Sequence, residues 1–232
     1  MTDLSIIIPA YQEAENLKVV LPRLIAVLEP MAIDHEIIIV DSDLPLDDTE
    51  AVCCEYTDTQ VRFVRRREGP SFGSAVRTGI AEASGRHVLC IDGDGSHDPA
   101  IIPNLYQNRQ QFDVVVASRY IEGGETKNNW VLTQMSLIVN FAFRVVFAID
   151  CNDISNSFKL YNGDELRRLH LVCDNFDLVE EILIKLKKNK PDLTIKEIPI
   201  IFHNRLHGQT KRKLLLFIFT FAYTLIRLRF MR

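Results

Sequence analysis

Two aspartates separated by a single glycine, Asp92 and Asp94, have the residue type and spacing best suited to chemistry. They follow the apolar run 88–91, which predicts a buried strand. Because side chains alternate along an extended backbone, both carboxylates would project from the same side. Carboxylate oxygens suit a hard cation such as Mg²⁺ or Mn²⁺, which also takes oxygens from a substrate phosphate. The pattern therefore predicts a cation site at a strand end, where Gly93 would let a ligand approach the backbone.

The alternative is an acidic turn that only caps the next helix. Asp98 followed by Pro99 is a typical pair of N-cap and first helical residue. An isolated Asp-x-Asp is compatible with both a helix cap and a cation site. The residues at the other strand ends are needed to choose between these two interpretations.

Three more apolar runs stop at polar residues. The runs at 4–8, 36–40 and 114–117 predict buried strands of an α/β fold, with helices between them. In open α/β sheets, ligands bind beyond the carboxyl ends of the strands. The polar residues that follow these three runs are Tyr11 and Glu13, then Asp41, then Arg119. Their repetition predicts one ligand-binding crevice that also includes the Asp-x-Asp.

The residues after the first two runs suit a nucleoside. The ring of Tyr11 could stack on a base, and Glu13 could accept a hydrogen bond from one. Asp41 could accept from a ribose hydroxyl or a base N–H, as acids at this position do in Rossmann-like folds. The structural alternative is that Tyr11 packs and Glu13 is a first-turn helix charge.

Common nucleotide motifs are missing from the sequence. Neither Gly-x-Gly-x-x-Gly nor a Walker P-loop follows a predicted strand, which disfavours a classical NAD or ATP site. The basic stretch 65–67 precedes a helix expected near Ser74, whose N-terminus could face an anion. A solvated basic face is the alternative, and it is the interpretation favoured for Arg66.

Composition fits one folded catalytic domain. The chain has 232 residues, 47% apolar content and a formal charge of −4, which argues against bulk electrostatic binding of nucleic acid. Its five cysteines form no Cys-x-x-Cys pair, which favours buried free thiols in a reducing compartment. No secretory leader is visible before the first predicted strand.

The C-terminal part predicts a separate helix. An apolar segment at 214–228 lies between basic clusters at 205–213 and 227–232. About 15 apolar residues are too few to span a bilayer comfortably, which takes about 20. A helix lying at the membrane interface is therefore expected over 213–232, after a catalytic domain at 1–212. A core helix or a helix that forms a homo-oligomer is the alternative.

Several sequence blocks resemble a known family. Ser5–Leu17, the run ending at Asp41, Asp92–Asp94 and Ala117–Tyr120 are similar to family 2 glycosyltransferases with the GT-A fold. The blocks Cys151–Tyr161 and Ile198–Lys211 resemble the branch of polyprenyl-phosphate (dolichyl-phosphate) mannose and glucose synthases. The resemblance implies a Rossmann-like, mixed but mostly parallel sheet flanked by helices.

The resemblance also implies roles for individual residues. The nucleotide would be held by Pro9, Ala10, Tyr11, Glu13, Asp41, Asp92, Gly93 and Ser96. Asp92 and Asp94 would bind Mg²⁺ or Mn²⁺. The acceptor or donor phosphates would meet Arg119, Arg205 and Lys211, and the catalytic set would be Asp94, Arg119 and Arg205.

The chain departs from the family pattern in three places. Ser42 stands where a second acid often follows Asp41, and the block usually written Thr-Ser-Gly-Phe is Ile154–Phe158 here. No arginine lies between Trp130 and Asn140, where one is expected to meet a lipid phosphate.

The function expected is inverting, metal-dependent transfer of a sugar from a GDP-mannose or UDP-glucose type donor to a polyprenyl phosphate. The protein would be peripherally associated with the cytoplasmic face of a membrane. One alternative is transfer to a hydroxyl of a glycan or lipid-linked saccharide in cell-surface polysaccharide synthesis, with Glu180 or Glu181 as general base. The other is a non-catalytic, nucleotide-binding partner at the membrane.

Overall fold

The computed structural model describes residues 2–208 and 223–230. Its centre is a seven-stranded sheet with the order β3-β2-β1-β4-β7-β5-β8, beside a two-stranded sheet of β6 and β9. The strands are β1 (Leu4–Pro9), β2 (His35–Asp41), β3 (Val61–Arg65), β4 (His87–Cys90), β5 (Val114–Ser118), β6 (Glu125–Thr126), β7 (Lys159–Asn162), β8 (Ile195–Pro199) and β9 (Ile201–Phe202).

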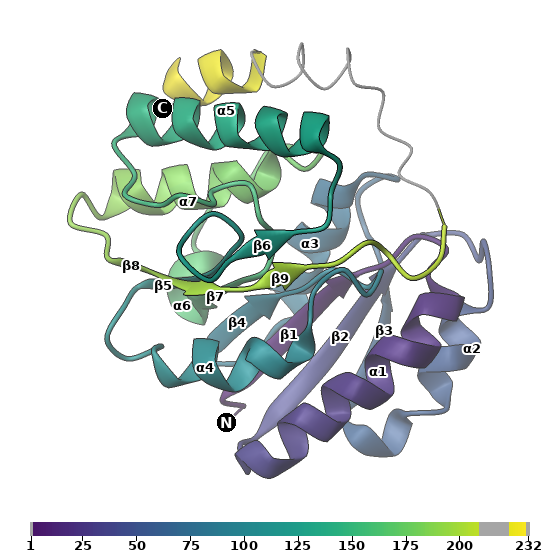
Figure 1. The fold of residues 1–232 in the computed structure, drawn as a ribbon. Coiled ribbons are helices and arrows are strands. Elements are labelled where there is room, and N and C mark those ends of the chain that lie inside the picture. The colour runs from purple at the N-terminus through teal and green to yellow at the C-terminus, as the bar shows by residue number, and fades with distance from the viewer. Residues whose placement is uncertain (1, 209–222, 231–232) are drawn as a thin grey trace.

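Helices cover both faces of the large sheet (Figure 1). They are α1 (Ala14–Leu28), α2 (Thr49–Cys54), α3 (Phe72–Glu82), α4 (Ile102–Gln107), α5 (Trp130–Phe147), α6 (Gly163–Arg167) and α7 (Leu178–Asn189), with 3₁₀ turns η1 (Glu29–Met31), η2 (Thr57–Thr59) and η3 (Pro99–Ile101). Helices α1, α2 and α4 pack on one face, and α3, α5, α6 and α7 on the other.

Strand β1 shows why the sheet is covered on both faces. Ile6 and Ile8 belong to the core under α1, whereas Ile7 belongs to the core under α3 and α7. All three side chains are fully buried. This alternation is the period-two geometry of a strand. It confirms the α/β fold with a mostly parallel sheet that the sequence predicts.

Strand β7 is the antiparallel member of the large sheet and was not predicted. It pairs with β4 and β5, and Lys159 lies opposite Cys90 on one side and Val116 on the other. Because β7 runs in the opposite direction, its first residue lies at the carboxyl ends of its neighbours. The preceding segment, 151–158, is thereby brought to the edge where the predicted site residues lie.

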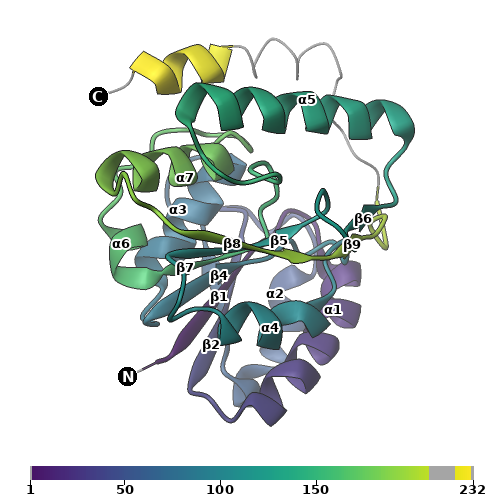
Figure 2. The ribbon, with the colours of Figure 1, turned by 60° about the vertical axis from the view of Figure 1, so that its left-hand side comes forward.

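Helix α5 is apolar, and much of it faces outward. Together with the helix 223–230 it forms the outer layer on its side of the sheet in both views (Figures 1 and 2). It has 18 residues, of which 17% are buried, and it is the one helix among the described residues long and apolar enough to cross a membrane. No helix was predicted over this segment from the sequence.

The predicted C-terminal helix is described only in part. Residues 223–230 are helical, while 209–222 and 231–232, with Lys211, lie outside the described residues. The helix 223–230 packs on α7, since Leu228 is 1% exposed and its carbonyl accepts a hydrogen bond from Lys188 Nζ at 2.9 Å. Within the described part, the helix with the length and apolarity of a membrane segment is therefore α5 rather than the C-terminal one.

Candidate active site

The turn after β4 carries the Asp-x-Asp and is stabilised by hydrogen bonds from backbone N–H groups to its own aspartate side chains. Ser96 N–H donates to Asp94 Oδ1 at 3.0 Å. Asp98 caps η3 by accepting from Ala100 N–H at 3.1 Å. Capping is thus done by Asp98, as the sequence predicts, and Asp92 and Asp94 remain available for another purpose.

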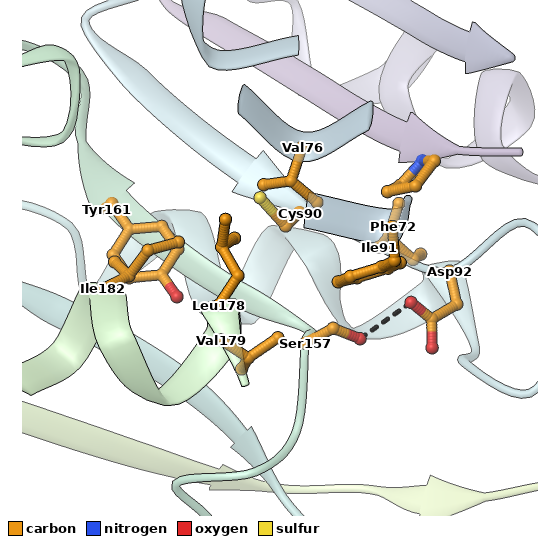
Figure 3. A pocket seen from close by; sticks show the side chains of 11 residues that line it. Phe72, Val76, Cys90, Ile91, Asp92, Ser157, Tyr161, Leu178, Val179 and Ile182 are labelled. Carbon is orange, nitrogen blue, oxygen red and sulfur yellow. Dashed lines mark hydrogen bonds between the residues drawn. The ribbon is translucent and has the colours of Figure 1, made fainter. Parts of the chain in front are cut away.

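Asp92 is oriented by two neighbours. Its Oδ1 accepts a hydrogen bond from Ser157 Oγ at 2.8 Å, beside an apolar pocket between α3 and α7 (Figure 3). Its backbone N–H donates to His97 Nδ1 at 3.2 Å, and His97 Nε2 lies 2.9 Å from Asn156 Oδ1. With Nδ1 accepting, the ring is placed to donate from Nε2 to Asn156 Oδ1. The buried ring of His97 is therefore a support of the turn.

Asp94 faces a cation of the protein itself. Arg205 donates to Asp94 Oδ2 from Nε at 3.2 Å and from Nη2 at 2.9 Å, and its Nη2 is 3.5 Å from Glu13 Oε1. Burial acts to raise the pKa of Asp94, but hydrogen bonds from Ser96 and Arg205 outweigh it and hold that pKa below its usual value. Asp94 is consequently an anion at neutral pH.

Glu13 completes an acidic cluster around Arg205. Burial raises the pKa of Glu13 above its usual value, against the hydrogen bond from Asn16 and the charge of Arg205, while Asp94 and Asp92 raise it further. Three carboxylates within electrostatic range of one another attract positive charge. In this structure the guanidinium of Arg205 supplies it.

These residues fit a divalent cation. Asp94 already binds a cationic group, and both aspartates provide hard oxygen ligands. Among the described residues no cluster of three or more His, Cys, Asp or Glu side chains could hold a metal ion. A cation bound by Asp92 and Asp94 would therefore complete its shell with water and the oxygens of a diphosphate.

The segment 203–207 lies directly over this turn. His203 N–H donates to Ser96 O and Leu206 N–H to Asp94 O, each at 2.9 Å. Gly95 has φ +78°, and a Cβ there would lie 2.5 Å from Leu206 Cδ1. Glycine is thus favoured at Gly95 by its backbone conformation, and a larger residue would also have to displace the side chain of Leu206.

A buried acid, Asp41, lies at the carboxyl end of β2, and the sequence predicts that it holds the nucleoside. Asp41 is 2% exposed, and its Oδ1 is buried with no hydrogen-bond partner among the described residues. Burial raises the pKa of Asp41. A buried oxygen without a partner costs free energy, which a bound donor group would recover.

Arg66 lies beside this acid, and its expected place on a solvated face is wrong. It is 5% exposed, because its chain folds under Tyr11, with the guanidinium 5.7 Å from that ring's centre. Nη1 donates to Ser71 O at 3.2 Å, while Nε and Nη2 are buried and have no partner among the described residues. An acceptor on Asp41 and donors on Arg66, next to an aromatic ring that is 48% exposed, complement the edge and face of a base.

Arg119 forms an ion pair with Asp153. Its Nε and Nη2 donate to the two carboxylate oxygens of Asp153 at 2.8 and 2.6 Å, and Nη2 also donates to Ser155 Oγ at 3.1 Å. The side chain of Arg119 is 9% exposed and that of Asp153 is fully buried. Its role in binding phosphate stays a prediction, and the contacts shown here are those of a structural ion pair.

The two candidate general bases lie on α7 and are buried. Glu181 is fully buried and accepts hydrogen bonds from Val172 N–H and Cys173 N–H at 2.8–3.0 Å, in addition to its ion pair with Lys185 at 2.7 Å. Lys185 lies four residues further along α7, and the carboxylate with which it pairs is buried rather than on the helix surface. Glu180 is 7% exposed.

Of the other nucleotide-binding predictions, Pro9 ends β1 and Ala10 N–H donates to Val40 O at 2.8 Å. Gly93 lies against Ile8, whose Cγ2 would be 3.0 Å from a Cβ. Ser96 is 1% exposed. These residues line the same carboxyl edge as Asp41 and Asp92, and their contact with a nucleotide stays a prediction.

Sequence comparison assigns the family. The family model of glycosyl transferase family 2 matches residues 5–169, and the chain belongs to this family. It is 30% identical over 214 residues to a dolichol-phosphate mannosyltransferase of Pyrococcus furiosus, covering 90% of this chain and 59% of that protein. It is 27% identical over 215 residues to the Saccharomyces cerevisiae protein of the same name, covering 89% and 80%. The chain thus spans about three-fifths of the archaeal relative.

Structural comparison agrees on the fold. Glucosyl-3-phosphoglycerate synthase from Mycobacterium tuberculosis, solved in complex with Mg²⁺ and UDP, superposes with a TM-score of 0.70 at 18% identity, covering 98% of this chain and 79% of that one. The GT-A-type α/β fold that the resemblance implies is confirmed.

Proposed function

We propose that this protein transfers a glycosyl group, with inversion, from a nucleotide diphosphate sugar to a polyprenyl phosphate. The observation that carries the proposal is the meeting of two sites at one sheet edge. The carboxylate turn after β4 offers ligands for a cation and diphosphate, and Asp41 with Arg66 offers an unsatisfied acceptor and donors for a base. The names of the two mannosyltransferases support the lipid acceptor.

The proposed step is a direct displacement. A phosphate oxygen of the acceptor attacks C1 of the sugar, the bond from C1 to the diphosphate oxygen breaks, and the electron pair leaves with the nucleoside diphosphate. A divalent cation on Asp92 and Asp94, when bound, would neutralise charge on that leaving group. Arg205 beside Asp94 would pair with a phosphate.

No general base is needed for this acceptor. A phosphate monoester has its second pKa near 6 and carries no proton that must be removed at neutral pH. This agrees with the burial of Glu181, whose carboxylate already accepts two backbone N–H groups. Transfer to a hydroxyl would need a general base, and Glu181 is already committed to these contacts, which favours the phosphate acceptor over a mechanism that uses Glu181.

The test is a panel of nucleotide sugars, GDP-mannose and UDP-glucose first, with polyprenyl phosphate in vesicles and Mg²⁺ or Mn²⁺. We expect labelled glycosyl lipid from one donor, and none in EDTA. Label only on saccharide hydroxyls would reject the acceptor assignment. Nucleotide binding with neither transfer nor hydrolysis would support the non-catalytic alternative.

We further propose that α5 rests on the membrane that holds the acceptor. Its large exposed side chains recur at helical spacing: Trp130, Ile138, Phe141 and Val145 are 62–74% exposed. In the helix 223–230, Tyr223, Ile226 and Phe230 are 58–81% exposed. An apolar surface of this kind marks a contact with lipid or protein.

Lying in the interface suits α5 better than spanning the bilayer. Its inner residues Val139 and Phe143 are packed in the core of the domain, so one side of the C-terminal half of the helix is covered by polypeptide. A helix with one apolar face free and the other face on a folded domain lies in the plane of the interface. The protein would then be peripheral, on the cytoplasmic face.

We expect Phe141→Asp to weaken binding to anionic lipid vesicles about tenfold or more, because a fully buried Phe contributes about 1.5–3 kcal/mol. Co-sedimentation with vesicles measures this. Leu44→Asp is the matched control, since Leu44 is 62% exposed on the loop after β2. Equal vesicle binding by both variants, with Phe141→Asp lowering the oligomeric mass, would assign α5 to a homo-oligomer contact instead.

The base site gives another prediction. Arg66→Met should weaken binding of the nucleoside diphosphate about tenfold or more, because a hydrogen bond to a charged group contributes about 1.5–3 kcal/mol. Isothermal titration of UDP and of GDP measures it. Arg67→Met is the control, because the side chain of Arg67 is 63% exposed and pairs with Glu82. Equal affinities in the two variants would remove Arg66 from the site.

A further inference from the structure

The segment 153–157 connects α5 to the carboxylate turn. At one place it is held by α5: Ser155 N–H donates to Asn140 Oδ1 at 2.9 Å, and Asn140 Nδ2 donates to Ser155 Oγ at 3.1 Å. Two residues further on, Ser157 Oγ donates to Asp92 Oδ1 at 2.8 Å (Figure 3). A helix on the outer layer is therefore linked to Asp92 through a short piece of chain.

This segment is fastened along its length. Asp153 is fully buried in its ion pair with Arg119. Lys159, itself fully buried, donates from Nζ to Ile154 O at 2.8 Å and also to Asn156 O. With its polar groups bound on both sides of Ser155, the segment has little freedom to absorb a displacement at one end.

Asn140 is an unusual residue for its place on α5. It is 3% exposed, on a mainly apolar helix, and Nδ2 also donates to Ser136 O at 2.9 Å. A buried amide is tolerated only when its hydrogen bonds are made, and an apolar residue would pack there without that requirement. Two of the hydrogen bonds of Asn140 go to Ser155, in the segment that holds Asp92. We infer that this link to the segment is the role of Asn140.

We propose that Asn140 is a positioning residue for Asp92, acting through Ser155 and Ser157. The inference rests on the proposed function, in which Asp92 binds the divalent cation. Ser157 fixes the rotation of the Asp92 carboxylate by holding Oδ1, and Asn140 fixes Ser157 by holding Ser155. The membrane-facing helix and the cation site are thereby parts of one connected unit.

The test measures Mn²⁺ affinity, by electron paramagnetic resonance of free Mn²⁺ during titration without nucleotide. Outer contacts of a metal ligand typically change metal affinity about 10–100-fold. We expect about tenfold weaker binding for Ser157→Ala and about fivefold for Asn140→Ala, because Asn140 acts one step further away. The double variant should bind about as weakly as Ser157→Ala alone, since both changes break the same linkage.

A matched control separates positioning from loss of stability. Val139→Ala truncates the neighbouring side chain on α5, which is 5% exposed, and should lower the melting temperature while leaving Mn²⁺ affinity unchanged. Ser155→Ala removes the hydroxyl acceptor and replaces Asn140→Ala if that variant does not fold; it should also weaken Mn²⁺ binding about fivefold.

Two outcomes would overturn the proposal and can be told apart. If Asn140→Ala and Val139→Ala bind Mn²⁺ equally, or the double variant shows the product of the two single effects, Asn140 has no positioning role while the cation site stands. If the unmodified protein binds no Mn²⁺, or Asp92→Asn leaves its affinity unchanged, the cation site itself fails and the positioning role fails with it.

Discussion

Replacing Asp94 by asparagine should lower glycosyl transfer by on the order of 10³-fold, because a metal ion contributes several kcal/mol of charge stabilisation and 1.4 kcal/mol is tenfold. The change keeps the shape of the side chain and removes its charge. Asp94 Oδ1 would still accept from Ser96 N–H, so the turn should keep its conformation. The ion pair with Arg205 is lost, so the melting temperature should fall somewhat, but the main loss should appear in turnover of the folded protein.

The neighbouring aspartate gives a control for this variant. Asp98 lies in the same turn, and its carboxylate caps η3 and is 3.3 Å from Arg23 at the surface. Asp98→Asn should retain transfer within about twofold, since asparagine caps a helix as well as aspartate. Equal turnover in Asp94→Asn and in the unmodified protein would contradict the role of Asp94 in holding a cation.

Replacing Arg205 by glutamine should have two effects of opposite sign. Transfer should fall by about 10²-fold or more, because a charged hydrogen bond to a phosphate is lost. Affinity for Mn²⁺ should rise several-fold at the same time, because Arg205 now pairs with Asp94 Oδ2 at 2.9 Å and competes with the cation. Transfer assays and titration of Mn²⁺ measure the two effects separately.

The pair of effects distinguishes two roles for Arg205. A residue that only stabilises the fold would lose both transfer and Mn²⁺ affinity on substitution. A residue that only binds phosphate would lose transfer with unchanged Mn²⁺ affinity. Tighter Mn²⁺ binding together with lost transfer is expected if Arg205 leaves Asp94 when the cation arrives and turns to a phosphate. Weaker Mn²⁺ binding would contradict this exchange.

The carboxyl edge of the sheet could be predicted because its signals are local. Each of β1, β2 and β4 is mainly apolar, and a polar residue follows each apolar run within three positions in the sequence. Adjacent parallel strands then place Tyr11, Asp41 and Asp92 at one edge whatever the loops do. This is why the fold and the Asp-x-Asp turn were accessible without a structure.

The segment 153–157 was not accessible in this way. Its importance depends on β7 inserting antiparallel between β4 and β5, which is a long-range pairing. The first residue of β7 is Lys159, a lysine that becomes fully buried, and no local pattern predicts that. The contact between Ser157 and Asp92 joins residues 65 positions apart.

Arg66 and α5 were missed for a similar reason. Three consecutive arginines have the same local character, and only the packing around Tyr11 buries Arg66 while Arg67 stays exposed. An apolar helix has the same sequence whether its outer face meets protein, lipid or solvent. In each case the side of the element that is covered is decided by distant parts of the chain.

The most direct test of the account is a crystal structure of the protein with Mn²⁺ and either UDP or GDP. We expect Mn²⁺ coordinated directly by oxygens of Asp92 and Asp94 and of the diphosphate, with the base between Tyr11, Asp41 and Arg66, and Arg205 released from Asp94. A nucleotide bound elsewhere, with Arg205 still paired to Asp94 and no metal on the turn, would contradict it.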